Sequence, residues 1–475
     1  MIDNELAFTP ATELIELISS KKVSPVELTE LYFERIDRLD SQLNSYLLLT
    51  RDEAIRTAKA AEKVVMRGDE LGPLHGLPIS IKDTQMTKGV ATTSGSRVFK
   101  DRIPQNDAAV VERVRSAGAV VLGKTNAPEF GLVGTCENNL GDHGRNPWNT
   151  GCVPGGSSGG AAAAMAACLC PLATGGDGGG SIRIPASFCG IYGIKPTQGR
   201  VSGYSGEEGP PLANLFSQQG PLSRTVRDSA LLLQVMAGYD PRDPTCLRET
   251  PPDFVEVVDR NIRGLRIAWS PDYGFAAVDP EVLEVTSRAA QVFEELGCDV
   301  EDSDLVMESP YDAYGPIYEA NAHASYGPYM ETHGDELTYY GRDFIEAGSK
   351  VTGAGYARAL GLIDRLKAQM TDLFEDYDLL LSPTLALSSL PVGEFPDEIA
   401  GRPVYPHRYF SFHPFTYPIN AIGHAAASIP AGFSSDGMPI GLHIVGKKGG
   451  EETVIAASAA FERAKPWIQH RPPVS

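Results

Sequence analysis

The sequence predicts an α/β fold in which at least some of the strands pair in parallel. Short apolar runs typical of buried strands alternate with longer segments of helical periodicity along most of the chain. Hydrophobic residues make up 42% of the 475 residues and charged residues 21%, which is ordinary for a globular protein. This length is enough for a large core, in one large unit or in up to about three domains.

The first expected elements are helices with clear start signals. Ser24, Pro25 and Glu27 form a capping box with proline at the first helical position, and apolar residues then recur at helical spacing. Thr50 and Glu53 repeat the capping pattern before a second helical segment. We therefore expect two helices before the first clear strand.

Strands and helices then alternate. The run "HGLPISIKDTQ" predicts a strand with Ile79 and Ile81 on one face and Ser80 and Lys82 on the other. A helix and a strand over 119–123 are expected next. The run "SSGGAAAAMAACLC" predicts a helix that leaves a glycine-rich turn, and "PLATGGD" predicts a strand followed by a loop.

The second half of the chain repeats this pattern around one irregular segment. The expected elements are a helix over 279–297 with a short strand after it, a helix over 356–375, a strand over 378–386, a loop over 389–406, a strand over 439–446 and a helix over about 450–464. Residues 305–345 are rich in Tyr, Pro and Gly and only weakly periodic. They are either a lid or wall of a substrate pocket or a surface insertion whose tyrosines pack locally.

Charge and cysteine content restrict the partners and the compartment. Lys and Arg total 41 against 61 Asp and Glu, a net charge of -20, which argues against nucleic acid as a partner. The seven cysteines contain no C-x-x-C pair, so we expect buried free thiols, no metal site and a reducing compartment. The N-terminus has no signal-peptide pattern and no apolar run reaches 18 residues. We therefore expect a cytoplasmic protein that makes no membrane contact.

The first of three features that could carry chemistry is "GGSSGG", residues 155–160. It matches the G-x-S-x-G nucleophile elbow of α/β-hydrolases, with Ser157 as the nucleophile. Several histidines follow it in the chain, so the order of a Ser-His-Asp triad is possible. The pattern equally fits a glycine-rich start that lets an alanine-rich helix pack closely.

The second feature is a cluster of glycines at 175, 176 and 178–180, directly before Ser181. Glycines leave backbone amides unshielded and permit unusual backbone angles. Amides aimed at one point form an oxyanion hole, which would make Ser181 a candidate nucleophile. The alternative is a tight glycine turn with Ser181 as a helix cap.

The third feature is Lys82 within an apolar strand. One interpretation is an edge-strand lysine that reaches solvent. If it is buried instead, its pKa falls by several units from ~10.4, and the neutral amine becomes a base near pH 7.

Together these blocks resemble the amidase signature family. The resemblance rests on "PLHGLPISIKD", "ENN…RNPWN", "GGSSGGAAAAMAA", "GGDGGGSIRIPASFCGIYGIKPT" and "GMPIGLHIVG", in that order. The spacings also agree with the family: 75 residues separate Lys82 from Ser157, and 24 separate Ser157 from Ser181. The match is densest over roughly 70–225 and poor over 240–375.

The resemblance implies a large mixed, twisted β-sheet covered on both faces by helices, and a Ser–cis-Ser–Lys triad. Ser181 would be the acyl nucleophile, Ser157 the bridging serine after a cis Gly156–Ser157 peptide, and Lys82 the base. The oxyanion hole would consist of the amides of Gly178, Gly179, Gly180 and Ser181.

Further residues follow from the same resemblance. Ser158 is expected to hydrogen-bond to the triad, and Asp177 and Arg183 to brace the nucleophile loop through buried hydrogen bonds. Cys136 stands where Ser or Thr is common in the family, and we expect it to line the substrate pocket together with Gly131.

The resemblance also suggests how the chain is organised. We expect a single domain over 1–475, with N-terminal helices over 1–65, a catalytic core over 66–235, a variable helical or lid insertion over 240–375, and a C-terminal part over 376–475 that completes the core.

The function implied is hydrolysis of C–N bonds in linear amides through a serine acyl-enzyme, without a cofactor. Small or aryl amides are the expected substrates, with possible ester and carbamate (urethane) hydrolysis, and the enzyme would be a monomer or homodimer. One alternative is an amidotransferase A-type subunit that acts with partner proteins. It is disfavoured by the acidic balance and by Ile184, which stands where that protein has a polar residue. The other alternative is a Ser-His-Asp hydrolase that uses Ser157.

Overall fold

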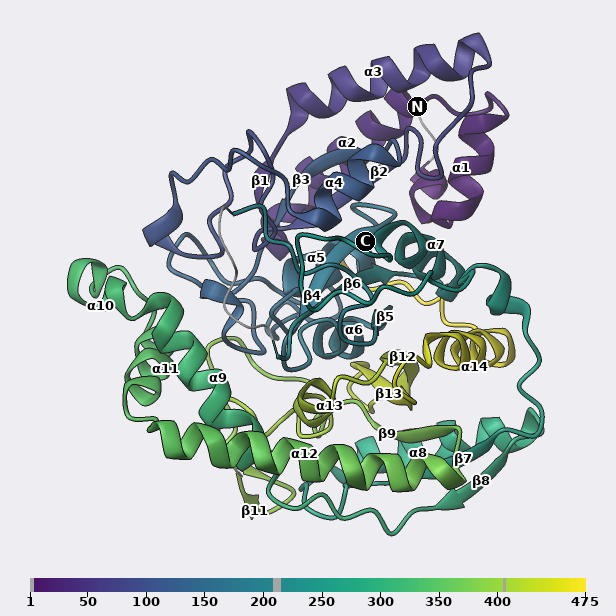
Figure 1. Ribbon diagram of the computed structural model, residues 1–475. Coiled ribbons are helices and arrows are strands. Elements are labelled where there is room, and N and C mark those ends of the chain that lie inside the picture. The colour runs from purple at the N-terminus through teal and green to yellow at the C-terminus, as the bar shows by residue number, and fades with distance from the viewer. Residues whose placement is uncertain (1–3, 208–214, 405–406) are drawn as a thin grey trace.

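The computed structural model describes residues 4–207, 215–404 and 407–475, and is built around one large mixed sheet (Figure 1). The sheet has 11 strands in the order β1-β3-β2-β4-β6-β5-β12-β13-β9-β7-β8. Strands β2, β3 and β4 pair in parallel, as do β7, β8 and β9, and the other pairs are antiparallel. The predicted α/β class with partial parallel pairing is confirmed.

The strands of the large sheet are β1 (Tyr46–Leu49), β2 (Pro78–Lys82), β3 (Val120–Thr125), β4 (Ala173–Asp177), β5 (Tyr192–Lys195), β6 (Gln218–Ser223), β7 (Arg266–Trp269), β8 (Asp299–Asp302), β9 (Leu379–Pro383), β12 (Ala426–Phe433) and β13 (Pro439–Gly446). A separate two-stranded sheet consists of β10 (Glu398–Ile399) and β11 (Arg402–Pro403).

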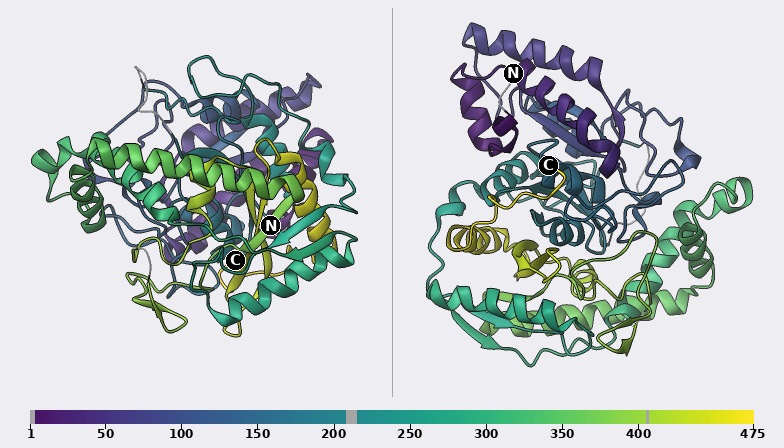
Figure 2. Two further views of the ribbon diagram at one scale, coloured as in Figure 1. Left: turned by 60° about the horizontal axis from the view of Figure 1, so that its bottom comes forward. Right: turned by 180° about the vertical axis from the view of Figure 1, so that it is seen from behind.

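The helices are α1 (Ala11–Ser19), α2 (Pro25–Leu43), α3 (Arg51–Arg67), α4 (Ala109–Ser116), α5 (Gly159–Ala166), α6 (Arg183–Cys189), α7 (Val226–Met236), α8 (Pro280–Glu295), α9 (Pro310–Tyr326), α10 (Pro328–His333), α11 (Tyr339–Ser349), α12 (Gly353–Asp376), α13 (Tyr417–Ile422) and α14 (Glu451–Ala464). They flank the sheet, and all three views place α10 and α11 at one far end of the molecule (Figures 1 and 2). No helix among the described residues is both long and apolar enough to cross a membrane.

Neighbouring parallel strands bring the candidate residues together at the carboxyl ends of the strands. Strands β2 and β4 pair in parallel at Ser80 and Ala173, so their carboxyl ends lie at the same end of the sheet. Lys82 is the last residue of β2, and Asp177 is the last residue of β4. The carboxyl ends of parallel strands are where α/β sheets build their sites, because the following loops converge there.

Beside these strand ends lies a second core made largely of aromatic side chains. It joins α9, α11, α12 and α13 and is separate from the aliphatic core around β2 and β3. Stacked rings include Phe130 on Tyr326, with centroids 3.8 Å apart, and Phe216 on Tyr314, with centroids 4.6 Å apart. The weakly periodic segment 305–345 is therefore largely helical, since its tyrosines pack inward against other rings.

Several sequence expectations need correction. The second capping box is absent, because the Thr50 hydroxyl donates to the Val121 carbonyl of the neighbouring strand and does not cap α3. Gly175 and Gly176 belong to β4 and not to a loop, since β4 pairs along its whole length with β6. The expected loop over 389–406 contains the short strands β10 and β11, while residues 405 and 406 lie outside the described part.

Candidate active site

Lys82 is buried on an interior strand of the sheet and faces a serine. Its strand lies between β3 and β4, and the side chain is 2% exposed, so it is not an edge-strand lysine that reaches solvent. Its Nζ lies 2.8 Å from the Ser157 Oγ and 3.1 Å from the Gly176 carbonyl oxygen. Burial lowers the pKa of Lys82 to about 7, although the negative charge of Asp177 acts in the opposite direction. Much of this amine is therefore neutral near pH 7.

Ser157 precedes α5, and the Gly156–Ser157 peptide is cis, as the resemblance implied. Position 156 has no room for a side chain, because a Cβ there would lie 1.8 Å from the Thr135 carbonyl oxygen. The next residue, Ser158, donates its backbone amide to the Ser181 carbonyl at 3.1 Å. Its hydroxyl lies 3.3 Å from both the amide and the carbonyl of Gly176. These contacts bring the GGSSGG segment against the Ser181 loop.

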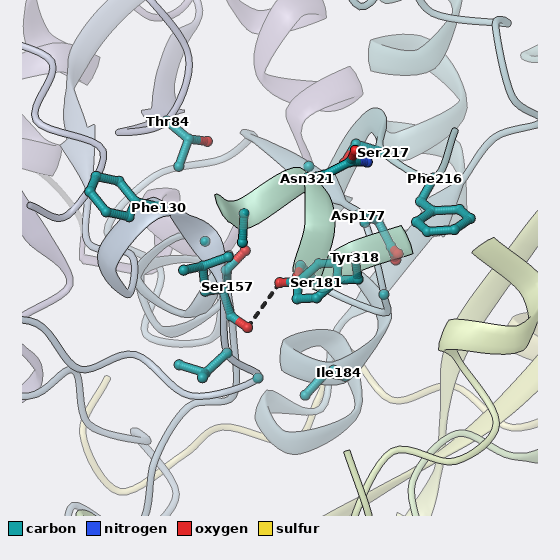
Figure 3. A pocket seen from close by; sticks show the side chains of 18 of the residues that line it. Thr84, Phe130, Ser157, Asp177, Ser181, Ile184, Phe216, Ser217, Tyr318 and Asn321 are labelled. Atoms are coloured by element: carbon teal, nitrogen blue, oxygen red, sulfur yellow. Dashed lines mark hydrogen bonds between the residues drawn. The ribbon is translucent and has the colours of Figure 1, made fainter. Parts of the chain in front are cut away.

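Ser181 follows β4 and borders the same pocket as Lys82 and Ser157. The pocket has a volume of about 310 Å³, and Figure 3 shows Ser157 and Ser181 within it, between Phe130 and Phe216. Within the described part of the chain, the Ser181 hydroxyl has no hydrogen-bond partner. It is not a helix cap either, because α6 begins after Ile182 without a side-chain cap.

A buried ion pair braces the Ser181 loop from behind. The Asp177 carboxylate accepts hydrogen bonds from the amides of Gly180 and Ile182, from the guanidinium of Arg183, and from the amide side chain of Asn420. Burial by itself raises the pKa of Asp177, but the Arg183 charge and these hydrogen bonds outweigh it and hold that pKa well below its ordinary value. Asp177 therefore stays ionised and fixes the turn.

This bracing corrects the expected oxyanion hole. The amide of Gly180 donates to the Asp177 carboxylate at 2.7 Å and is not available to a ligand. In the described structure, the amides of Gly178, Gly179 and Ser181 have no internal acceptor. Of the four amides expected to bind an oxyanion, three therefore remain without an acceptor in the described structure.

The pocket walls are mainly aromatic and apolar. Phe130, Gly131, Leu132, Ile184, Leu215, Phe216, Tyr314, Tyr318, Tyr326, Tyr409 and Phe410 contribute to them, and Thr84, Ser217, Gln219, Asn321 and Ser325 add neutral polar groups. Gly131 lines the pocket as expected, and its missing Cβ would lie 3.2 Å from the Ser157 Oγ.

Cys136 does not line the pocket, contrary to the expectation. Its side chain is fully buried, and its thiol packs where a Cβ on Gly144 or Gly159 would otherwise lie. Burial raises the pKa of its thiol to about 12, so this cysteine is an uncharged packing residue.

Histidine does not complete a triad around Ser157. His413 borders the pocket, but its two ring nitrogens contact the Thr416 hydroxyl and the Tyr409 carbonyl. Among the described residues, no histidine hydrogen-bonds to Ser157 or Ser181. The same residues contain no cluster of three potential metal ligands.

Sequence reasoning missed three residues that shape the site: Tyr314, Thr416 and Asn420. The hydroxyls of Tyr314 and Thr416 donate to the carbonyls of Gly178 and Gly179, and Asn420 contacts Asp177. They lie far along the chain, in segments whose sequence carries no motif that could have indicated this contact.

Comparison with known proteins fits this geometry. The family model described as Amidase matches residues 27–455. An acylamidase of Rhodococcus erythropolis is 36% identical over 99% of this chain and 98% of its own. The A-type subunit of the glutamyl-tRNA(Gln) amidotransferase of Moorella thermoacetica is 38% identical over 98% of this chain and 99% of its own.

Solved structures agree with the sequence comparisons. A bacterial aryl acylamidase of the amidase signature family superimposes with a TM-score of 0.90 at 34% identity, covering 97% of each chain. A 6-aminohexanoate cyclic dimer hydrolase, solved with its substrate, does so with a TM-score of 0.88 at 31% identity, covering 98% of this chain and 99% of its own. The chain therefore belongs to the amidase (amidase signature) family and is a hydrolase of amide C–N bonds.

Proposed function

We propose that the protein hydrolyses neutral, apolar or aromatic amides through an acyl-enzyme on Ser181. The observation that carries this proposal is the contact of the buried Lys82 amine with the Ser157 hydroxyl at 2.8 Å, beside a Ser181 hydroxyl that has no partner in the described structure. The lowered pKa of Lys82 supports a role as the base.

The proposed reaction begins with two proton transfers. Neutral Lys82 accepts the hydroxyl proton of Ser157, which in turn takes the proton of Ser181 as the Ser181 Oγ bonds to the amide carbonyl carbon. The carbonyl oxygen becomes an oxyanion, and the amides of Gly178, Gly179 and Ser181 would stabilise it. The proton then returns from Lys82 through Ser157 to the leaving nitrogen, and the C–N bond breaks.

In the second half-reaction, water hydrolyses the acyl-enzyme and releases the carboxylic acid. Water donates a proton along the same relay while its oxygen attacks the acyl carbon, and the Ser181 Oγ leaves and is reprotonated. The same acyl-enzyme forms whether nitrogen or oxygen departs, so we propose ester and carbamate hydrolysis as side activities. The proton relay ending at Lys82 favours amides, because a leaving amine needs a proton.

The pocket lining supports a neutral substrate. Among the described lining residues, Lys82 and Asp177 are the groups that carry or gain a formal charge near neutral pH, and Asp177 is already paired with Arg183. A charged substrate would lose hydration without gaining an opposite charge, which costs several kcal/mol. The aromatic wall formed by α9, within the proposed insertion over 240–375, suits an aryl group.

An amidotransferase A-type subunit is the second candidate, because one such protein is 38% identical to this chain over 98% of its length. Free glutamine carries an ammonium and a carboxylate, and the described pocket lining offers neither of them a free counter-charge. We therefore propose a stand-alone enzyme, monomer or homodimer, that acts on small molecules in the cytoplasm.

The test combines labelling and turnover with the purified chain alone. A fluorophosphonate should label Ser181, as read by peptide mass spectrometry, and Ser181→Ala should lose about 10⁵-fold or more in turnover of 4-nitroacetanilide while folding normally. Label on Ser157 would support the elbow mechanism instead. Hydrolysis that appears only when a partner protein is added would support the amidotransferase.

A further inference from the structure

Two hydroxyl groups from remote parts of the chain hold the glycine loop before Ser181. Tyr314, on α9, donates its hydroxyl to the Gly178 carbonyl at 2.8 Å. Thr416, directly before α13, donates its hydroxyl to the Gly179 carbonyl at 2.7 Å. Both loop carbonyls are thus fixed by side chains that lie 136 and 237 residues further along the chain.

The glycines are what permit this close approach. A Cβ added at Gly179 would lie 2.7 Å from the Tyr314 hydroxyl oxygen, and one at Gly180 would lie 2.3 Å from the Thr416 Oγ1. Both distances are shorter than a nonbonded contact allows, so a side chain at either position would push a hydroxyl away from the loop. The loop and the two hydroxyls fit each other only while these positions are glycine.

Fixing a carbonyl also aims the amide on the far side of the same peptide plane. The Gly178–Gly179 peptide is trans, so the Gly179 N–H points opposite to the Gly178 carbonyl that Tyr314 holds. The Gly179–Gly180 peptide is held at both ends, by Thr416 at its carbonyl and by Asp177 at its amide. The Gly179 N–H is left without an acceptor in the described chain, although its plane is fixed.

Tyr314 itself has little freedom to move. Its ring is fully buried, and it stacks on Phe216 and on Tyr318, with centroids 4.6 Å and 5.2 Å apart. Burial raises the pKa of its hydroxyl well above the ordinary value, so the hydroxyl stays protonated and can donate near neutral pH. A rigid donor of this kind can hold a peptide plane in one orientation.

We propose that Tyr314 and Thr416 are positioning residues that aim the oxyanion-binding amides of the glycine loop. They touch the loop carbonyls and not the reacting atoms. Tyr314 orients the Gly179 amide through the peptide plane that they share, and Thr416 fixes the next plane, whose amide Asp177 holds, so that Gly179 is restrained on both sides. This inference rests on the proposed function, in which Ser181 attacks and these amides bind the oxyanion. It makes α9 part of the machinery that determines turnover as well as a wall of the pocket.

The test compares transition-state binding with ground-state binding in Tyr314→Phe. With 4-nitroacetanilide, we expect kcat to fall about 10- to 100-fold, less than for loss of an oxyanion donor, while KM stays within about threefold. Phenylboronic acid, which forms a tetrahedral anionic adduct with a serine, should bind weaker by a similar factor. Inhibition by the product 4-nitroaniline, which does not occupy the oxyanion hole, should stay within about twofold.

Matched variants separate positioning from a general loss of packing. Tyr32→Phe removes another buried tyrosine hydroxyl, whose partner is the Ala7 carbonyl 3.4 Å away and which lies outside the pocket, and it should leave kcat and boronate inhibition unchanged. Thr416→Val should reproduce the Tyr314→Phe pattern. Thr416→Ser keeps the hydroxyl, so its kcat and boronate inhibition should be close to those of the wild type. The Thr416 pair also tests the inference if Tyr314→Phe does not fold.

The outcomes can be told apart from failure of the proposed function. Wild-type kcat in both Tyr314→Phe and Thr416→Val would overturn this inference, as would a loss of kcat with no change in boronate inhibition. If Ser181→Ala is inactive at the same time, the proposed function stands and only the positioning role is lost. If Ser181→Ala remains active, the proposed function fails first.

Discussion

Two buried lysines lie on neighbouring strands of the sheet, and only one of them contacts a serine of the proposed triad. Lys82 ends β2, and Lys124 lies in β3 opposite Ile81, so the two side chains leave the sheet on opposite faces. Burial lowers the pKa of each to about 7. Lys124 reaches the Gln85 carbonyl and the hydroxyls of Thr87 and Thr92, while Lys82 reaches the Ser157 hydroxyl at the pocket.

This difference shows that a lowered pKa alone does not identify a catalytic base. The Lys124 amine has three acceptors, the number that an ammonium can serve, and the carboxylate of Asp83 lies nearby. It ties the chain leaving β2 to β3. Among the described residues, the Lys82 amine contacts only the Gly176 carbonyl besides its serine, and it borders a pocket. The position of the partner, and not the burial, separates the proposed base Lys82 from the structural lysine Lys124.

Among the tests of the contrast between the two lysines, Lys82→Met should have the largest effect. Removing the proposed base should lower kcat/KM by about 10³- to 10⁴-fold, because Ser181 then loses its proton acceptor. The measurement is turnover of 4-nitroacetanilide, with circular dichroism as the check on folding. Activity within tenfold of wild type would remove the distinction between the two lysines.

The next largest effect is the pH dependence. Lys82 acts as a base only when it is neutral, and its pKa of about 7 places the loss of activity on the acid side. With that pKa, kcat/KM should rise with pH and level off above about pH 8, and the value at pH 5 should be about 100-fold below the plateau. A rate that stays flat down to pH 5 would contradict the assignment.

Lys124→Met should mainly change stability. The variant leaves the Gln85 carbonyl without its donor and the buried Asp83 without its nearby cation, which should lower the free energy of unfolding by about 3 kcal/mol. Because Lys124 does not border the pocket, kcat/KM should stay within about tenfold and the acid limb of the pH profile should remain. Urea unfolding and the same pH series measure both effects. A loss as large as that of Lys82→Met would make the two lysines equivalent.

The smallest effect is expected for Cys136→Ala. This thiol is buried near Lys82 of the proposed triad but does not line the pocket, so kcat/KM should change less than about threefold and stability by about 1 kcal/mol. Iodoacetamide should not inactivate the native enzyme through this residue. Rapid, activity-linked alkylation of Cys136 would mean that the pocket reaches it.

Local sequence signals predicted the elements that depend on local interactions. The capping box at Ser24 and the strand over 439–446 are both present as expected. The capping pattern at Thr50 failed because its hydroxyl found a partner on β3, which is a tertiary contact. Gly175 and Gly176 looked like a loop because glycine disfavours strands, and only their pairing with β6 overrides that preference.

The candidate site likewise has features that the sequence could indicate and features that depend on tertiary contacts. Lys82, Ser157 and Ser181 lie in long motifs, so a resemblance could indicate them, but the strand pattern left open whether Lys82 is buried or reaches solvent. The commitment of the Gly180 amide to Asp177 and the full burial of Cys136 depend on three-dimensional packing. No spacing in the sequence encodes either one.

The double contact of α9 has a consequence for redesign and for divergence within the family. The helix supplies part of the aromatic wall, and it also hydrogen-bonds to the loop that precedes Ser181. Grafting a foreign helix at this position to accept a new substrate would also remove the Tyr314 hydroxyl. A chimera that retains this one tyrosine while exchanging its neighbours should acquire a new substrate selectivity and keep its kcat.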